Sequence, residues 1–378
     1  MCYYFNKLKL TGSEDSIMNG TIRLSKENFS HCPKELLKIG SISVTTFCYP
    51  SGVEGLRIKN NIGYIVLLPY QGQQIWDAVF FNRNLKMKNL FTDPVPTREL
   101  LGSYGAFLFH CGARRMGTPG PDDDHQLHGE LPGMAYDDAW IEFGEKDGRN
   151  FVALSGVYHY VQAFGDKYDA VPIVRIFEDS TIVEVEMNIT NLASKPMDLM
   201  YMLHVNFAPG DNAEIVQAAQ WTPEDMVLRT SIPSHVTPTK EYLALLDEMK
   251  NNPGKTRVIR PEDSYDPEVV YFINNLRSDE NGETHMLQKH ADGTADYIAY
   301  NPAVFDHTVR WILIHDDQKV NAMALPATCG PEGYTREKEK GTIKSLAPGE
   351  TKTFSVKVGA LNPEAAKSMS DKIEKLTQ

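Results

Sequence analysis

The sequence lacks several features that would place it in a specialised class of protein. No apolar run approaches the roughly 18 residues that a membrane-spanning helix needs. Lys7 and Lys9 interrupt the N-terminal segment, which therefore has no apolar core of the kind found in signal peptides. The five cysteines are Cys2, Cys32, Cys48, Cys111 and Cys329. They are odd in number and include no closely spaced pair, so they indicate neither a disulfide framework nor a zinc finger. We expect a cytoplasmic protein without a membrane contact.

Basic charge is also scarce. The 378 residues include 50 acidic and 38 basic side chains, which gives a formal net charge of −12. This balance argues against binding of nucleic acid phosphates or anionic lipid over a broad face, but it is compatible with a neutral ligand such as a sugar. The chain has no Walker loop, no G-x-S-x-G or H-E-x-x-H motif and no Rossmann glycine fingerprint. Nucleotide chemistry and ordinary serine hydrolysis are therefore disfavoured.

Alternation of apolar and polar residues dominates the chain and predicts β-strands. In residues 182–190, Val183 and Val185 fall on one face while Glu184 and Glu186 fall on the other. This period of two is typical of a half-buried antiparallel strand. Further strands are predicted in residues 41–48, 64–69, 151–157, 171–177, 199–207, 269–273, 309–315 and 351–358.

Helical patterns are few, and they occur in residues 239–250 and 362–377. The second pattern begins with an N-cap asparagine followed by proline, Asn362-Pro363. Length alone suggests two or three domains, but many strands, few helices and no break in composition favour one large all-β domain. We predict a single domain over residues 1–378, with N-terminal strands in about 1–40, a core sandwich in about 41–360 and a C-terminal helix in about 362–377.

The densest group of chemically useful side chains lies in residues 119–142. Glycine and proline exclude a regular helix there, so the segment is predicted to be an irregular loop. Asp124, His125, His128 and Glu130 lie close together within it. Imidazole and carboxylate groups suit acid–base chemistry, sugar binding or ligation of a divalent metal. A solvated acidic loop, with its histidines bonded to backbone carbonyls, is the alternative interpretation.

A second group lies in the predicted strand at residues 201–207. The alternation places Met202, His204 and Asn206 on one face of this strand. Two polar side chains on one face could line a cleft. A buried histidine that only satisfies its own hydrogen bonds is the alternative.

A third group combines amides with aromatic rings. Gln73 and Gln74 lie between Tyr70 and Trp76, and such side chains commonly bind sugars by stacking and by paired hydrogen bonds. A bulged strand edge with a buried tryptophan explains the same residues. Arg115 could reach the same cleft, or it could be one of a pair of solvated arginines.

Three segments, in this order, resemble the aldose 1-epimerase (galactose mutarotase-like) superfamily, specifically its poorly characterised epimerase-like branch. Leu127-His128-Gly129 resembles the superfamily segment whose histidine contacts the sugar. Residues 188–204 resemble the strand, turn and strand that end in the catalytic histidine, here His204. Residues 346–350 read Leu-Ala-Pro-Gly-Glu and resemble the closing L-x-P-G-E turn. The resemblance spans about residues 40 to 360.

The resemblance implies an all-β, galactose mutarotase-like supersandwich of large antiparallel sheets, with a few short helices and a carbohydrate cleft on a concave face. In such mutarotases a histidine protonates the ring oxygen while a carboxylate removes the proton of the anomeric hydroxyl. His204 would then be the acid, and His128 would hold the sugar or share that role. Both the acid and the base need a pKa near the working pH.

The chain departs from the family at the expected base. The family's glutamate commonly stands just before a proline near the C-terminus, where this sequence has Leu325 before Pro326. Leucine cannot accept a proton. Either Glu332, Asp124 or Glu130 supplies the base, or the chain does not perform ordinary mutarotation.

The family also has an early Asn-Arg motif, whose dipeptide match is Asn82-Arg83, so Arg83 is a rival to Arg115 as a contact for the substrate. We predict a carbohydrate-active protein, most simply a mutarotase or sugar isomerase that needs no cofactor. The alternatives are a non-catalytic sugar-binding or sugar-sensing protein that lost its base, and a metal-dependent sugar isomerase with a divalent ion at His125, His128 and Glu130. The expected partner is a small carbohydrate. A monomer or a homodimer is expected, since an exposed strand edge can pair two chains.

Overall fold

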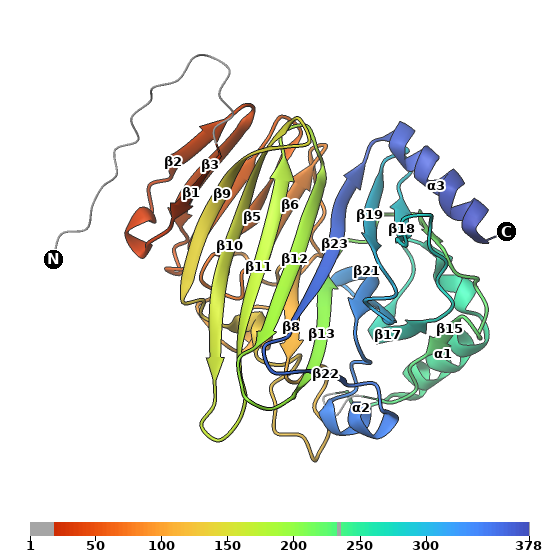
Figure 1. The fold of residues 1–378 in the computed structure, drawn as a ribbon. Coiled ribbons are helices and arrows are strands. Elements are labelled where there is room, and N and C mark those ends of the chain that lie inside the picture. Colours follow the sequence, from red (N-terminus) through yellow and green to blue (C-terminus); the bar gives the residue numbers. More distant parts are fainter. Residues whose placement is uncertain (1–18, 233–235, 378) are drawn as a thin grey trace, which may run out of the picture.

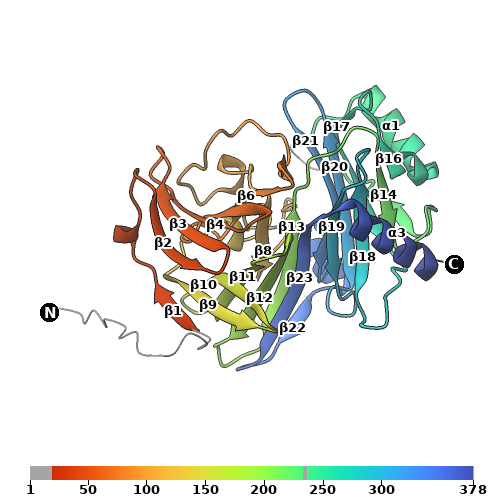
Figure 2. The same ribbon diagram turned by 90° about the horizontal axis from the view of Figure 1, so that it is seen from above.

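The fold is built from two large antiparallel sheets, A and B, that pack against each other (Figure 1 and Figure 2). The computed structural model describes residues 19–232 and 236–377. The part of the predicted N-terminal strands that precedes residue 19 lies outside these described residues. The prediction of an all-β supersandwich is confirmed.

Sheet A comprises ten strands of the described chain. They are β1 (Gly20–Arg23), β9 (Asp138–Lys146), β10 (Arg149–Val161), β11 (Lys167–Phe177), β12 (Ile182–Asn191), β14 (Ala213–Gln217), β16 (Val258–Ile259), β18 (Thr284–Lys289), β19 (Ala295–Tyr300) and β23 (Thr351–Leu361). Their order across the sheet is β1-β9-β10-β11-β12-β23-β19-β18-β14-β16. The central position of β23 shows that the C-terminal strand closes the sheet between early and late parts of the chain.

Sheet B comprises thirteen strands within residues 19–232 and 236–377. They are β2 (Lys34–Ile39), β3 (Ile42–Cys48), β4 (Glu54–Lys59), β5 (Gly63–Leu67), β6 (Ile75–Phe80), β7 (Arg83–Asn84), β8 (Leu108–Ala113), β13 (Met197–Val205), β15 (Met226–Leu228), β17 (Tyr265–Ile273), β20 (His307–Ile314), β21 (Lys319–Ala327) and β22 (Lys344–Leu346). The main order is β15-β17-β20-β21-β13-β8-β6-β5-β4-β3-β2, with β7 paired to β6 and β22 paired to β13.

The alternation in the sequence explains the packing between the sheets. In β12, Val183, Val185 and Met187 are buried, whereas Glu184 and Glu186 on the opposite face are only half-buried. The apolar face joins a core cluster that also contains side chains of sheet B. Burying apolar surface contributes about 25 cal/mol per Å² removed from water, so this inter-sheet core is the main source of stability.

Three helices occur in the described residues: α1 (Lys240–Asn251), α2 (Tyr334–Lys340) and α3 (Pro363–Thr377). The helices predicted over 239–250 and 362–377 are thus confirmed as α1 and α3. Thr239 caps α1 by accepting a hydrogen bond from the backbone N–H of Tyr242. The short α2 was not predicted, because its seven residues carry no apolar periodicity. α1 packs on β15 and β17, and α3 packs on β14, β18 and β23.

Four single-turn 3₁₀ helices complete the described chain: Lys26–Asn28, Leu100–Gly102, Leu131–Gly133 and Pro253–Arg257. Among the described residues, no helix is both long and apolar enough to cross a membrane.

Candidate active site

A cavity of about 900 Å³ lies on one face of sheet B. The neighbouring strands β17, β20, β21 and β13 contribute side chains to its lining. The remaining lining comes from the segments before and after β8, the segment from β15 into α1, the turn between β20 and β21, and Pro331 after β21. Its ionisable and phenolic side chains are Tyr104, His128, His204, Arg229, Tyr242, Asp266, Glu268 and His315. The cavity therefore collects side chains that lie far apart in the sequence.

His204 lies in this cavity because of the alternation of β13. Met202 and His204 both line the cavity, as the predicted common face requires. The amide nitrogen of Asn206 donates to the carbonyl of Ala106 at 2.9 Å, which leaves the amide oxygen facing Nδ1 of His204 at 2.7 Å. Nδ1 therefore carries the proton. Nε2 accepts a hydrogen bond from the hydroxyl of Tyr104 at 3.0 Å.

Burial fixes the charge states of this pair. Removal from water lowers the pKa of His204 well below its usual value, and nearby His128 lowers it further, whereas the bond to Asn206 opposes the shift. Burial likewise raises the pKa of Tyr104 well above its usual value. His204 is consequently a neutral base and Tyr104 a protonated donor.

His128 is placed by the turn that the Leu-His-Gly segment forms against the end of β8. The backbone of His128 donates to the carbonyl of Gly117 and accepts from the N–H of Gly112. Gly129 follows at φ +83°, and a side chain there would lie 2.0 Å from the carbonyl oxygen of Arg115, so only glycine fits. The ring of His128 lies 5.3 Å from that of His204. Burial, with Arg229 nearby, lowers the pKa of His128 to about 4.

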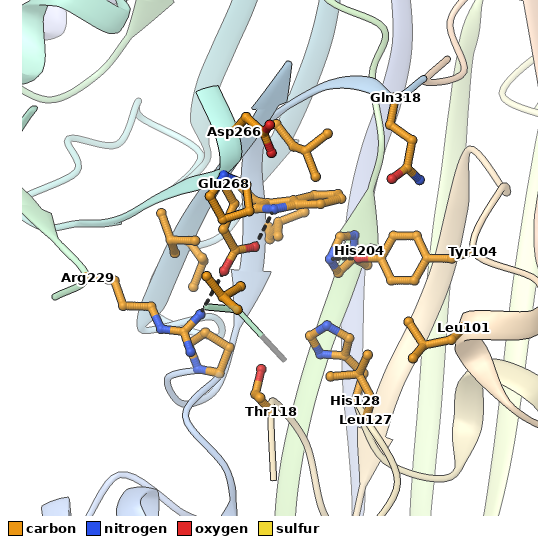
Figure 3. A pocket seen from close by; sticks show the side chains of 18 of the residues that line it. Leu101, Tyr104, Thr118, Leu127, His128, His204, Arg229, Asp266, Glu268 and Gln318 are labelled. Carbon is orange, nitrogen blue, oxygen red and sulfur yellow. Dashed lines mark hydrogen bonds and ion pairs between the residues drawn. The ribbon is translucent and has the colours of Figure 1, made fainter. Parts of the chain in front are cut away.

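A carboxylate faces the histidines from another strand, and it is Glu268 of β17. Its Oε2 accepts a hydrogen bond from the indole N–H of Trp311 at 2.8 Å, and its Oε1 lies 3.4 Å from Nη1 of Arg229. The ring of Trp311 also lies 5.5 Å from the ring of His204. Figure 3 shows Glu268 and Arg229 on one side of the cavity, with His204, His128 and Tyr104 on the other.

The spacing of the strands leaves room for a ligand between these groups. β20 and β21 separate β17 from β13. Neighbouring strands lie about 4.8 Å apart, so three steps separate the two backbones by roughly 14 Å. Glu268 and His204 both line the cavity, and Trp311 of β20 contacts each of them from the strand between. A small ring can therefore contact a proton acceptor and an imidazole at once.

The sequence analysis did not single out Glu268, because the predicted strand begins one residue later, at Val269. The sequence did contain a clue to Glu268. It lies two residues before Val270, so the two share one face of the strand, and both line the cavity. The pairing of β17 with β20 is irregular between Tyr265 and Val269. Arg229 carries no comparable pattern, because it follows a strand of only three residues.

Glu332, the sequence-predicted catalytic carboxylate, does not line the cavity. It binds Ser231, Lys340 at 2.5 Å and Nε of Arg229 at 3.7 Å. Burial alone would raise its pKa, but the hydrogen bonds from Lys340 and Ser231 hold the pKa of Glu332 below its usual value. Leu325, at the position where the family resemblance requires a carboxylate, does line the cavity.

The predicted sugar-binding amides and arginines also lie outside the lining. Gln73 and Gln74 are fully buried, and their amide nitrogens donate to the carbonyls of Pro69 and Pro132. Nη1 of Arg83 lies 2.6 Å from Oδ1 of the buried Asp296. The guanidinium of Arg115 stacks 3.5 Å from the ring centre of Tyr334. These side chains therefore make structural contacts within the fold: Arg83 joins β7 to β19, and Arg115 packs on α2.

Of the four candidate site residues in the acidic loop, only His128 lines the cavity. Asp124 is exposed. His125 bonds to the carbonyl of Gln126 and to the backbone N–H of Tyr334. Glu130 accepts from two backbone N–H groups and from Tyr168 at 2.7 Å. In residues 19–232 and 236–377, no three histidine, cysteine or acidic side chains come close enough together to hold a metal ion.

Comparison with known proteins identifies a family and solved structures that are similar to this chain. A family model described as "Domain of unknown function (DUF4432)" matches residues 51–360. No curated protein matches the sequence. Among solved structures, a proposed aldose 1-epimerase from Klebsiella pneumoniae subsp. pneumoniae MGH 78578 superposes with a TM-score of 0.76 at 17% identity, covering 95% of this chain and 92% of that one.

Two further solved structures have the same fold. A galactose mutarotase-like protein from Clostridium acetobutylicum gives a TM-score of 0.58 at 12% identity over 85% of this chain and 99% of that one. A galactose mutarotase related enzyme from Lactobacillus acidophilus gives 0.52 at 10% identity over 82% and 98%. At these identities the likeness shows the fold, which is galactose mutarotase-like, as the resemblance in the sequence implied.

Proposed function

The chain belongs to the DUF4432 family, and we propose that it is an aldose 1-epimerase-like enzyme that interconverts the two anomers of a sugar. The observation that carries the proposal is the pairing of Glu268 and His204 across one cavity, with Trp311 in contact with both. Mutarotation needs one base and one acid within reach of the same anomeric centre. The galactose mutarotase-like fold supports a carbohydrate as the ligand.

The proposed reaction uses two proton transfers. Glu268 takes the proton of the anomeric hydroxyl while the bond between the anomeric carbon and the ring oxygen breaks. Protonated His204 gives its Nε2 proton to the ring oxygen, which produces the open-chain aldehyde. Rotation about the adjacent carbon–carbon bond and reversal of both transfers close the ring with the opposite configuration. Atoms and protons balance without a cofactor, and none is part of the proposal.

Residues next to Glu268 and His204 position the two groups and affect their chemistry. Arg229 and the indole N–H of Trp311 hold the carboxylate of Glu268 in position, because each binds one of its oxygens. Burial makes the imidazolium of His204 a strong acid that is present in a small fraction of molecules at neutral pH. His128, neutral and next to His204, is suited to hold a sugar hydroxyl.

The test is anomer exchange measured by NMR at equilibrium across a panel of aldoses. We expect acceleration over buffer for at least one sugar. The variant His204→Asn keeps a polar side chain of similar size but loses the acid, so its rate should fall by about 10²- to 10⁴-fold. Exposed His31→Asn is the matched control and should retain the full rate. No acceleration with any aldose would refute the proposal.

A second candidate is a sugar-binding protein without catalysis, and the position of Leu325 favours it. Leu325 lines the cavity where the family resemblance calls for the proton acceptor. This candidate predicts that calorimetry detects binding of a sugar whose anomer exchange is not accelerated. Acceleration that depends on Glu268 would eliminate it.

A further inference from the structure

The cavity is larger and more apolar than an unmodified sugar requires. Its volume of about 900 Å³ lies near the top of the roughly 300–1,000 Å³ that hold drug-sized ligands. A single sugar ring is smaller than such a ligand, so it fills only part of the space. Away from the acid–base groups, the apolar lining residues are Leu90, Phe91, Leu101, Val236, Leu313 and Pro267.

Two of these residues lie exposed at the rim. Leu90 and Leu101 are 72% and 71% exposed, and both belong to the segment that precedes β8. Exposed leucines that are scattered singly over a surface need no explanation. Here two of the most exposed large apolar side chains of the described chain border one cavity, and Phe91 lies beside Leu90 in its lining. The rim thus offers apolar surface that only a bound molecule would cover.

Both leucines line the same cavity as the proposed acid–base centre. Leu101 lies three residues before Tyr104, whose hydroxyl binds His204, and Figure 3 shows Leu101 on the same side of the cavity as Tyr104 and His128. The other polar lining groups, Asp266, His315 and Gln318, remain available to sugar hydroxyls. A ligand whose anomeric carbon lies between Glu268 and His204 would therefore extend its opposite end toward an apolar rim.

We propose that the substrate is a sugar that carries an apolar substituent, such as an acyl chain, on the end remote from its anomeric carbon. Leu90 and Leu101 are the specificity-determining residues that bind this substituent. The inference rests on the proposed function for the placement of the anomeric carbon. The hydrophobic effect supplies the discrimination, because each methylene group fully buried at the rim strengthens binding by about fourfold.

The experiment compares D-glucose and D-galactose with their 6-O-acetyl, 6-O-butanoyl and 6-O-hexanoyl esters. Calorimetry measures the dissociation constant of each compound, and NMR measures its anomer exchange. We expect affinity to rise at least tenfold from the acetyl to the hexanoyl ester of one sugar. Equal affinity along both series, or no binding of any member, overturns the inference.

Variants test whether Leu90 and Leu101 at the rim are responsible for the effect of chain length on affinity. The double variant Leu90→Asn/Leu101→Asn should lose most of the gain in affinity between the acetyl and the hexanoyl ester. Leu192→Asn, at an exposed leucine outside the cavity, is the matched control and should change neither value. An undiminished gain in the double variant overturns the assignment of these leucines.

The two proposals fail in distinguishable ways. Accelerated anomer exchange without any effect of chain length leaves the proposed function intact and refutes the apolar subsite. Affinity that grows with chain length without accelerated exchange supports the subsite and refutes the epimerase.

Discussion

The two sides of the cavity are built on different principles. On the side of His204, a chain of hydrogen bonds runs from Tyr104 through His204 of the buried strand β13 to Asn206, and the groups are neutral. On the opposite side, Glu268 is held by Arg229 and Trp311 on a strand whose register is irregular. Regular alternation is thus enough to position His204, whereas the position of Glu268 depends on contacts between distant segments.

Among the predicted changes, replacing Glu268 by glutamine should have the largest effect on the rate of anomer exchange. Glu268→Gln keeps the shape and the bond from Trp311 but cannot accept a proton. We expect anomer exchange to slow by about 10²- to 10⁴-fold, with a smaller change in sugar affinity. Steady-state exchange NMR and calorimetry measure the two quantities.

Glu332→Gln is the matched control for this prediction, because Glu332 also lies near Arg229 but outside the cavity lining. Its rate should change less than about tenfold. If Glu332→Gln loses activity and Glu268→Gln does not, the sequence-predicted base is the correct one.

The pH dependence of activity tests whether His204 acts in its protonated form. The free protein holds His204 neutral, because burial lowers its pKa well below its usual 6.5. The proposed acid is the protonated form, so kcat/KM should fall by about tenfold per pH unit above that pKa. Measurements between pH 4.5 and 8 test this. An activity that rises with pH across the whole range would identify His204 as a base.

Stability should change with pH in the opposite direction. The pKa values of His204, His128 and His110 are all lowered by burial, to about 4 for His128 and about 3 for His110. Their stabilising contribution is complete above the unfolded pKa of about 6.5 and is lost as pH falls toward the folded values. Each contributes up to about 1.4 kcal/mol per pH unit. Urea denaturation at pH 7 and 5 should show the loss.

The smallest expected effects concern the single hydrogen bonds that position each group. Tyr104→Phe removes a donor to neutral His204 and should lower the free energy of unfolding by about 1 kcal/mol. Trp311→Phe removes a donor to the charged Glu268, and it should cost about 2 kcal/mol or more, since the indole's second ring is lost as well. Denaturation curves of the two variants measure which loses more free energy of unfolding. A loss in Trp311→Phe no larger than that in Tyr104→Phe would contradict this ranking.

The regular elements of the fold were predictable because local patterns reflect burial. The predicted strand at 182–190 corresponds to β12 (Ile182–Asn191), and the N-cap and proline at Asn362-Pro363 begin α3. Register and strand order were not predictable. β23, the last strand of the described chain, lies between β12 and β19, and only contacts between distant parts of the chain decide such a neighbour.

By itself, the sequence determined the alternating faces of the strands and the shared face of Met202, His204 and Asn206. Each of these follows from spacing along the chain, which local geometry converts directly into direction. Only the tertiary structure decided that Glu268, and not Glu332, lines the cavity with His204. Three strand spacings and a shared contact with Trp311 bring these two together, and neither leaves a mark in the local sequence.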